Sequence, residues 1–341
     1  EHTLGENRRE DGLYHAYNVL QVGPGTAAVG HLYEMLEGQV AILSSGLLSA
    51  GEALTLLQSL RHSALYRADQ DSYILYPDRD LPGFLQKNRV HPDLVKKSVL
   101  LTRLIDQGDS TLIVRDENGM SHFPGSFRNA RDVERALAAL RAHAEYTDLV
   151  DAEYGAILDL FESVFDHASF TGRSGTFFAY EGLGSIYWHM VSKLLLAVQE
   201  TLLRAHAQGE SSSTVQALIE RYYDIRSGLG FNKPPDVYGA FPTDPYSHTP
   251  AGQGAKQPGM TGQVKEELLA RMAELGVFVE QGALCFDPLM LRESELTTEE
   301  TTFSYIDIVG QEQAIELPPG SLAYTFCQVP IVCVPSREDV V

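Results

Sequence analysis

An apolar stripe at helical spacing runs through residues 183–202 and constrains this chain more than any other feature. Its members recur every three or four positions; they are Leu183, Ile186, Tyr187, Met190, Leu194, Val198 and Leu202. This pattern predicts one long amphipathic helix. The same spacing recurs in shorter stretches, which are residues 31–49, 49–63, 129–144, 151–168 and 213–230. We therefore expect a mainly helical body.

Strand patterns occupy two other parts of the chain. Within residues 66–127, a short strand is expected near residue 74, followed by a hairpin in which "ENG" supplies the left-handed turn geometry. After Gly276, a hairpin pattern comes first, and further stretches then alternate or run apolar with β-branched and aromatic residues.

The expected fold class is therefore mainly α with an appended β region. The expected domains are a helical body at residues 1–275, with a β-containing excursion at 66–127, and a C-terminal β region at residues 276–341. The last helix of the body is expected to begin at Thr261 as its N-cap and to end at Gly276. The apolar face of that helix would consist of Val264, Leu268, Met272 and Leu275.

The charge balance excludes some classes of partner. The formal net charge is −20, from 46 acidic and 26 basic residues. Nucleic acids and anionic membrane surfaces bind clustered Lys and Arg, and the sequence has no such cluster. No apolar run approaches the roughly 18 residues that a membrane-spanning helix needs. We expect neither nucleic acid nor a membrane as a partner.

The three cysteines, Cys285, Cys327 and Cys333, have neither a disulfide framework nor zinc spacing. Cys327 and Cys333 would share a face if they lay in one strand, and buried thiols are expected. Unpaired thiols favour the cytoplasm. The chain begins without Met and without a signal-like segment, which fits a processed chain or a portion of a longer polypeptide.

The first candidate site is the stretch "RREDGLYHAYN", residues 8–18. It combines charged, aromatic and amide side chains, the mixture that a polar ligand such as a sugar requires. Arg9, Tyr14, His15 and Asn18 are the candidate binding residues. The alternative is an exposed, salt-bridged N-terminal loop.

The second candidate site is "FTGRSGTFFAYEGLGSIYWHM", residues 170–190. Its glycines indicate a tight turn or a close backbone approach before the long helix. Glu181 precedes that helix, where a carboxylate is stabilised as the anion, and is a candidate base or hydroxyl acceptor. Trp188 is the chain's only tryptophan. It could be a stacking platform or a core residue.

The third candidate site is the Pro- and Gly-rich stretch at residues 228–262. Structureless segments longer than ~12–15 residues are usually functional or disordered, and the aromatic residues here favour an ordered functional loop. The candidate residues are Asn232, Lys233, Asp236, Asp244, Tyr246, His248, Thr249 and Gln257. The helix start at Thr261 would present free N–H groups to an anion or an electron-rich oxygen.

Several familiar motifs are absent from the sequence. It contains no P-loop, no "GxSxG" elbow and no "HExxH" helix. The histidines His167, His189 and His248 are too scattered to form a metal set. We expect no metal and no cofactor.

Three stretches resemble one family of carbohydrate enzymes. "TGRSGTFFAYEGLGSIYWHM", "AFPTDPYSHTP" and "QPGMTGQVKEELLARMAELGV" are similar in pattern to six-hairpin (α/α)-toroid enzymes, in particular the cellobiose-phosphorylase-like glycoside hydrolases and phosphorylases. The resemblance covers about residues 150–290. It implies an (α/α) toroid-like helical body and a small C-terminal antiparallel β domain.

The resemblance also implies a function, which is inverting cleavage or phosphorolysis of a glycosidic bond, with inorganic phosphate as a co-substrate in the second case. Glu181 and Asp244 would be the carboxylate pair, with Asp236 as a substitute. Arg173, His248, Thr249 and Thr261 suit phosphate or a sugar hydroxyl, and Tyr180, Trp188 and Tyr246 suit sugar rings.

Two alternatives to this function remain open. One is a non-catalytic subunit that binds a carbohydrate or a partner chain. The other is a lyase or epimerase that uses Tyr and His for proton transfer. The expected partners are an oligosaccharide and, in the first alternative, another chain or the remainder of a longer polypeptide.

Overall fold

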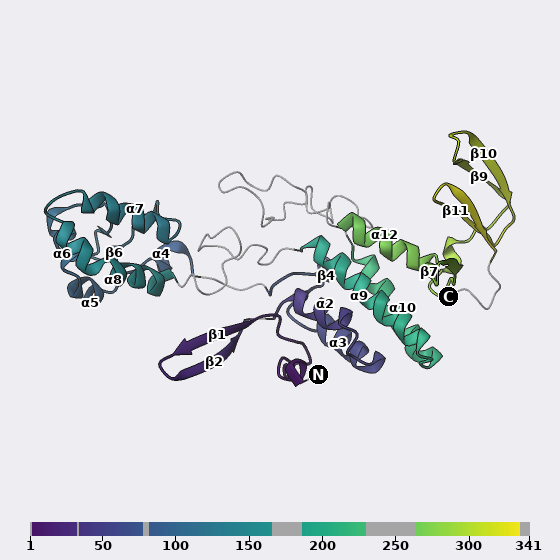
Figure 1. Cartoon of the computed structure of the whole chain (residues 1–341), viewed down its shortest axis with the longest axis horizontal. Coiled ribbons are helices and arrows are strands. Elements are labelled where there is room, and N and C mark those ends of the chain that lie inside the picture. Colours follow the sequence, from purple (N-terminus) through teal and green to yellow (C-terminus); the bar gives the residue numbers. More distant parts are fainter. Residues whose placement is uncertain (1, 33, 78–81, 166–185, 230–262, 335–341) are drawn as a thin grey trace.

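The computed structural model describes residues 2–32, 34–77, 82–165, 186–229 and 263–334 (Figure 1). Its helices of eight or more residues are α2 (Leu36–Ser44), α3 (Ala50–Arg61), α6 (Val99–Gln107), α7 (Ala130–Arg141), α8 (Thr147–Phe165), α9 (Trp188–Ala207), α10 (Ser212–Ser227) and α12 (Gln263–Glu274). Shorter helices are α1 (His2–Gly5), α4 (Phe84–Lys87) and α5 (Pro92–Lys97).

The strands pair as antiparallel two-stranded hairpins. In chain order they are β1 (Asn18–Gly23) with β2 (Thr26–His31), β3 (Tyr66–Arg67) with β4 (Ser72–Tyr73), β5 (Val114–Arg115) with β6 (Ser121–His122), β7 (Val277–Glu280) with β8 (Ala283–Phe286), β9 (Thr301–Ile306) with β10 (Glu312–Leu317), and β11 (Leu322–Phe326) with β12 (Val329–Cys333).

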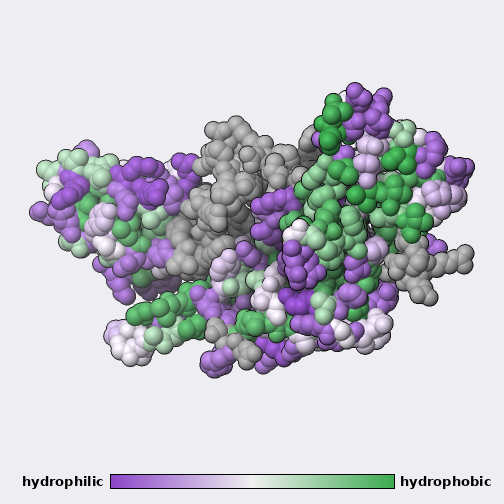
Figure 2. Space-filling view, turned by 45° about the vertical axis from the view of Figure 1, so that its right-hand side comes forward, coloured by the Kyte–Doolittle hydropathy of each residue, from purple (hydrophilic) through white to green (hydrophobic). Residues whose placement is uncertain are grey.

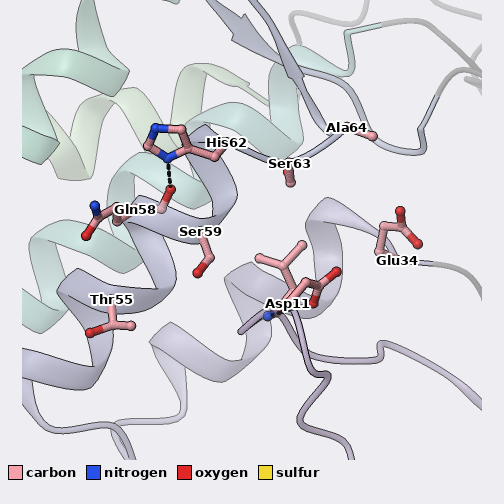
Figure 3. A pocket seen from close by; sticks show the side chains of 9 residues that line it. Asp11, Glu34, Thr55, Gln58, Ser59, His62, Ser63 and Ala64 are labelled. Carbon is pink, nitrogen blue, oxygen red and sulfur yellow. Dashed lines mark hydrogen bonds between the residues drawn. The ribbon is translucent and has the colours of Figure 1, made fainter.

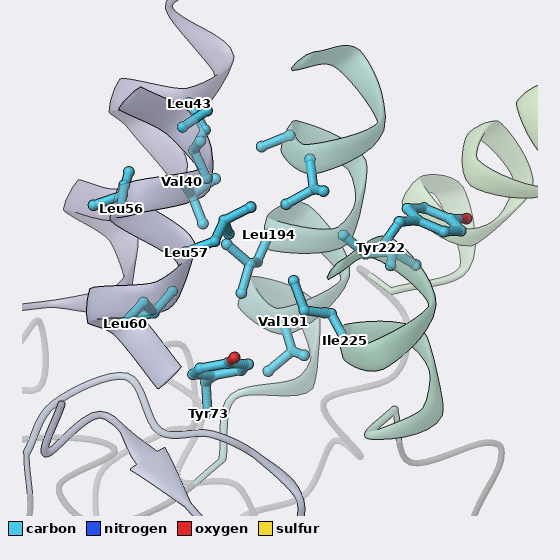
Figure 4. Packing of buried hydrophobic residues seen from close by; sticks show 14 of the residues in the cluster. Val40, Leu43, Leu56, Leu57, Leu60, Tyr73, Val191, Leu194, Tyr222 and Ile225 are labelled. Carbon is cyan, nitrogen blue, oxygen red and sulfur yellow. The ribbon is translucent and has the colours of Figure 1, made fainter. Parts of the chain in front are cut away.

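The first hydrophobic core surrounds α9. This helix contacts α2, α3, α10 and α12, and α3 also contacts α10. Figure 4 shows Leu57 of α3 beside Leu194 of α9. Leu194 and Val198 of the predicted stripe are fully buried, which confirms the apolar face of α9. The predicted start is wrong, because Ile186 and Tyr187 precede the helix, which begins at Trp188, and Leu183 lies outside the described residues. The start of α3 is set by a capping box, in which Ser49 accepts a hydrogen bond from the backbone N–H of Glu52 while the Glu52 carboxylate accepts one from Ser49.

The second hydrophobic core lies within residues 84–165 and shares no residue with the first. Phe161 meets Phe123 edge to face with ring centroids 4.9 Å apart. The Glu153 carboxylate of α8 accepts a hydrogen bond from the Val99 backbone N–H at 2.9 Å and another from the Ser98 hydroxyl, at the start of α6. Because the first N–H groups of a helix have no partner within it, this carboxylate holds α6 against α8.

The chain enters its C-terminal strands at Gly276, directly after α12. Gly276 has φ +68°, and a Cβ there would lie 2.0 Å from the carbonyl oxygen of Asp287. Any other residue would clash with that carbonyl, so glycine is required for the turn into β7. Apolar side chains of the hairpins that follow reach the surface (Figure 2), among them Val279, which is 68% exposed.

The predicted fold class is wrong. In the described residues the helices form two bundles with separate cores rather than a toroid around one centre. Strand pairs occur from residue 18 onward, so β structure is not confined to an appended region. Helical periodicity is a property of one segment, and it leaves open which helices meet. The boundary predicted between residues 275 and 276 stays a prediction.

Several local expectations can be compared with the structure directly. The hairpin with "ENG" is confirmed as β5–β6, with Gly119 at φ +81°. The hairpin β1–β2 was not predicted. Cys327 is exposed with φ +49°, in the turn between β11 and β12 rather than in a strand, so the expectation that it is a buried thiol is wrong. No helix in the described part of the chain is long and apolar enough to cross a membrane.

The predicted apolar face of α12 is also wrong. Leu268 is 65% exposed, whereas the buried positions four residues apart are Glu266, Ala270 and Glu274. Two carboxylates thus occupy the face that contacts α9. They are retained there because α9 and α10 supply basic and hydroxyl partners for them, as the next subsection describes.

Candidate functional site

The guanidinium group of Arg9, in the N-terminal loop, binds two carboxylates. Arg9 Nη2 lies 2.7 Å from Asp11 Oδ2, and Arg9 Nη1 lies 3.2 Å from Glu34 Oε2. The hydrogen bond from Arg9 lowers the pKa of Asp11, and the Leu13 backbone N–H, 3.1 Å from Asp11 Oδ1, acts in the same direction. Asp11 is therefore ionised at neutral pH, and Arg9 fixes both acidic side chains in place.

Asp11 and Glu34 line a cavity of about 510 Å³ (Figure 3). The opposite wall is α3 and the residues after it, which contribute Thr55, Gln58, Ser59, His62, Ser63 and Ala64; Leu13 completes the lining. Apart from Leu13 and Ala64, every lining side chain carries a hydrogen-bonding group. The cavity thus presents hydrogen-bonding groups together with a comparable amount of apolar surface.

A glycine lets the N-terminal loop approach α3 closely. Gly12 has φ +83°, and a Cβ at this position would lie 2.7 Å from the Ser59 hydroxyl oxygen. The short distance between loop and helix thus depends on the missing side chain. Because Gly12 directly follows Asp11, this contact also sets the position of that carboxylate relative to α3.

None of the four predicted residues of the N-terminal stretch lines this cavity. Arg9 affects the cavity indirectly, because its guanidinium group binds the Asp11 and Glu34 carboxylates that line it. The backbone of Tyr14 pairs with the buried Gln39 side chain, which accepts from the Tyr14 N–H at 3.0 Å and donates to the Tyr14 carbonyl at 2.8 Å. The roles predicted for Arg9 and Tyr14 in sugar binding stay predictions.

His15 and Asn18 both contact His31, at the open end of the β1–β2 hairpin. The His15 ring stacks on the His31 ring with centroids 4.2 Å apart, and His31 Nδ1 lies 2.8 Å from the Asn18 side-chain oxygen. Burial, together with the neighbouring His31, lowers the pKa of His15. Their predicted contact with a sugar also stays a prediction.

A second polar contact joins the first turns of α9 and α12. His189 Nε2 lies 3.1 Å from Glu266 Oε1. Glu266 is 7% exposed, and its other oxygen has no hydrogen-bond partner among the described residues. Trp188, beside His189, is 3% exposed within the first core. Its predicted stacking on a sugar ring stays a prediction.

A buried charge network continues along α12. The fully buried Glu274 accepts a hydrogen bond from the Tyr222 hydroxyl at 2.5 Å and pairs with Arg226 at 3.0 Å and Arg271 at 2.7 Å. Burial, followed by the charge of Glu274, raises the pKa of Tyr222, so the phenol stays protonated as a donor. Sequence reasoning missed this network. Its only sequence signal is the three- and four-residue spacing of acidic and basic residues on α12.

Most of the predicted catalytic and binding residues lie outside the described residues. These are Arg173, Tyr180, Glu181, Asn232, Lys233, Asp236, Asp244, Tyr246, His248, Thr249, Gln257 and Thr261. Their assignments stay predictions. The second stretch, residues 170–190, is described only from Ile186, and its His189 at the start of α9 contacts Glu266 at the start of α12, just after the third stretch.

One comparison with known proteins bears on the function. Residues 81–168 match the family model described as GH149 phosphorylase insertion domain 2. This range coincides with the second core, whose members lie between residues 84 and 165. The match links the chain to a glycoside phosphorylase family through one insertion domain. No curated protein matches the chain.

Proposed function

We propose that this chain acts on oligosaccharides as a glycoside phosphorylase or as part of one. The observation that supports the proposal most strongly is the match of residues 81–168 to a phosphorylase insertion domain. The matched stretch has its own hydrophobic core, so the similarity covers a whole structural unit rather than an isolated motif. The resemblance of residues 150–290 to cellobiose-phosphorylase-like enzymes points to the same class of reaction.

The proposed reaction is an inverting phosphorolysis. An oxygen of inorganic phosphate attacks the anomeric carbon, the glycosidic C–O bond breaks, and a carboxylic acid gives its proton to the departing sugar oxygen. Glu181 and Asp244 are the proposed carboxylates, with Asp236 as the substitute. Arg173, His248 and Thr249 are proposed to hold phosphate. The contact between the starts of α9 and α12 supports a common site, because both predicted stretches end at those helices.

A non-catalytic role is the second candidate. It is favoured by the nature of the match, because the model describes an insertion domain rather than a catalytic domain. In this case residues 81–168 would serve binding, and the chain would hold a carbohydrate or a partner without turning it over.

Phosphorus NMR of the whole chain with orthophosphate and a panel of gluco-oligosaccharides tests the proposal. We expect a glycosyl phosphate signal to grow as orthophosphate is consumed. Because phosphorolysis uses one carboxylic acid, one of the two variants Glu181→Gln and Asp244→Asn should slow it by at least about 100-fold, the scale of a lost general acid. The matched control is Glu200→Gln, at an exposed position on α9.

Each other outcome has a definite meaning. Sugar release without consumption of phosphate would make the chain a hydrolase, and an unsaturated product absorbing in the ultraviolet would make it a lyase. Saturable oligosaccharide binding without turnover, unchanged in both carboxylate variants, would support the non-catalytic role and refute the proposed enzyme.

A further inference from the structure

The polar cavity between the N-terminal loop and α3 has hydrogen-bonding capacity that the fold does not use. Among the described residues, the side chains of the exposed Gln58 and the half-buried Ser59 have no hydrogen-bond partner. His62 Nδ1 lies 2.8 Å from the Gln58 carbonyl oxygen and donates to it, so in the neutral ring Nε2 is left as an acceptor (Figure 3). Ser63, by contrast, is satisfied, since it donates to the Leu60 carbonyl at 2.8 Å.

The two carboxylates on the facing wall complement these groups. Asp11 and Glu34 are held by Arg9, yet a carboxylate has about four acceptor positions and Arg9 occupies only some of them. One guanidinium faces two carboxylates, so the local charge is not positive. A phosphate group would meet acidic oxygens here, whereas a neutral hydroxyl can donate to them.

The size and the apolar part of the lining narrow the class of ligand. A volume of about 510 Å³ falls within the roughly 300–1,000 Å³ of small-molecule sites. Ala64, which is exposed, and a small part of the buried Leu13 supply the apolar contact for the C–H face of a sugar ring. Among the described residues, no Phe, Tyr or Trp side chain lines the cavity. Recognition therefore depends on hydrogen bonds to several hydroxyls.

We propose that this cavity binds a neutral saccharide through its hydroxyl groups, with Asp11 and Glu34 as acceptors and Gln58 and Ser59 as donors and acceptors. The choice of a carbohydrate rests on the proposed function, but the preference for a neutral ligand over phosphate rests on the cavity alone. This cavity would bind the sugar, and phosphate would bind at another part of the molecule.

Ligand-observed NMR titration of the whole chain tests this inference. The probes are glucose, mannose and galactose, a gluco-trisaccharide and, separately, orthophosphate. We expect saturable binding of at least one saccharide with Kd in the millimolar range. Gln58→Leu and Ser59→Ala should each weaken it about fivefold, the loss expected for one neutral hydrogen bond. Ala64→Leu, at an exposed lining position, should weaken it further by filling the cavity.

The controls separate a specific effect from a general one. Gln216→Leu makes the same change at an exposed position on α10 and should leave Kd unchanged. Far-UV circular dichroism verifies that each variant is folded. The inference is overturned if no saccharide saturates, if Gln58→Leu and Gln216→Leu have equal effects, or if orthophosphate binding is the one that responds to Ser59→Ala.

The inference and the proposed function can fail independently. Phosphorolysis with Kd and KM unaffected by the cavity variants would refute the saccharide site and leave the function standing. Saccharide binding that is lost in the cavity variants, in a chain that consumes no phosphate, would support the site and refute the phosphorylase.

Discussion

Replacing the buried carboxylate of Glu274 should destabilise the first core while leaving the rest of the chain unaffected. Glu274 is fully buried and holds three groups at once, which are the Tyr222 hydroxyl and the guanidinium groups of Arg226 and Arg271. Glu274→Gln keeps the shape of the side chain and one acceptor oxygen. It removes the charge that the two arginines face, so the change tests electrostatics rather than volume.

The expected loss of unfolding free energy depends on the ion pairs that Arg226 and Arg271 keep when the charge of Glu274 is removed. Breaking a buried ion pair by removing one partner costs about 3–5 kcal/mol. Here Arg226 keeps Glu267 at 3.1 Å, and Arg271 keeps Glu295 at 2.5 Å, so neither cation is left alone. We therefore expect the lower end of the range, about 3 kcal/mol of unfolding free energy.

Trp188 provides the assay because it is the only tryptophan and lies within the first core. Urea unfolding followed by its fluorescence reports on that core, and the shift in midpoint at constant m-value gives the free-energy change. Glu220→Gln, at an exposed position on α10, is the matched control and should change stability by less than about 0.5 kcal/mol. The reasoning fails if Glu274→Gln costs no more than this control.

Three further predictions concern other parts of the chain. Phe161→Ala should cost about 3–5 kcal/mol in the second core, seen by hydrogen exchange, and leave the Trp188 fluorescence transition in place; a shift of that transition would show that the cores unfold together. Asn88→Ala leaves a buried backbone N–H and C=O unpaired, at about 1–3 kcal/mol each, and should speed amide exchange in the same core; unchanged exchange would contradict it. Because the pKa of His15 is lowered on folding, the unfolded chain binds its proton first: stability is complete above pH ~6.5 and falls as the pH drops toward the lower, folded value. Once corrected for the intrinsic pH dependence of exchange, amide protection in residues 18–31 should therefore fall below pH ~6.5, and His15→Gln should remove that fall; an equal loss of protection in the variant would refute it.

The candidate site could be predicted from sequence only in part. The crowding of polar and aromatic residues in 8–18 marks the N-terminal loop correctly as a place where polar groups gather. The groups that complete the cavity, Gln58, Ser59 and His62, lie on a helix whose pattern indicates nothing but an amphipathic segment. They reach the site because α3 lies opposite Gly12, and that contact joins positions more than forty residues apart in the chain.

Helix α12 was predicted at the right place in the chain, but the wrong face of it was predicted to be buried. Its position between Thr261 and Gly276 agrees with the structure, which has a helix at Gln263–Glu274. Hydrophobicity alone assigned Leu268 to the buried side, yet Leu268 is 65% exposed and Glu274 is buried. A carboxylate can be buried only when partners satisfy it, and those partners belong to α10 and to α12 itself.

The sequence by itself determined the local elements of this protein. The helical stripe of α9, the capping box of α3 and the turn of β5–β6 depend on residues a few positions apart, whose spacing sets the backbone conformation directly. Only the tertiary structure decided that the helices form two cores instead of a toroid, that α12 buries its carboxylates, and that the N-terminal loop and α3 enclose a polar cavity. These features depend on contacts between distant segments, and the periodicity of one segment carries no information about which partner will cover it.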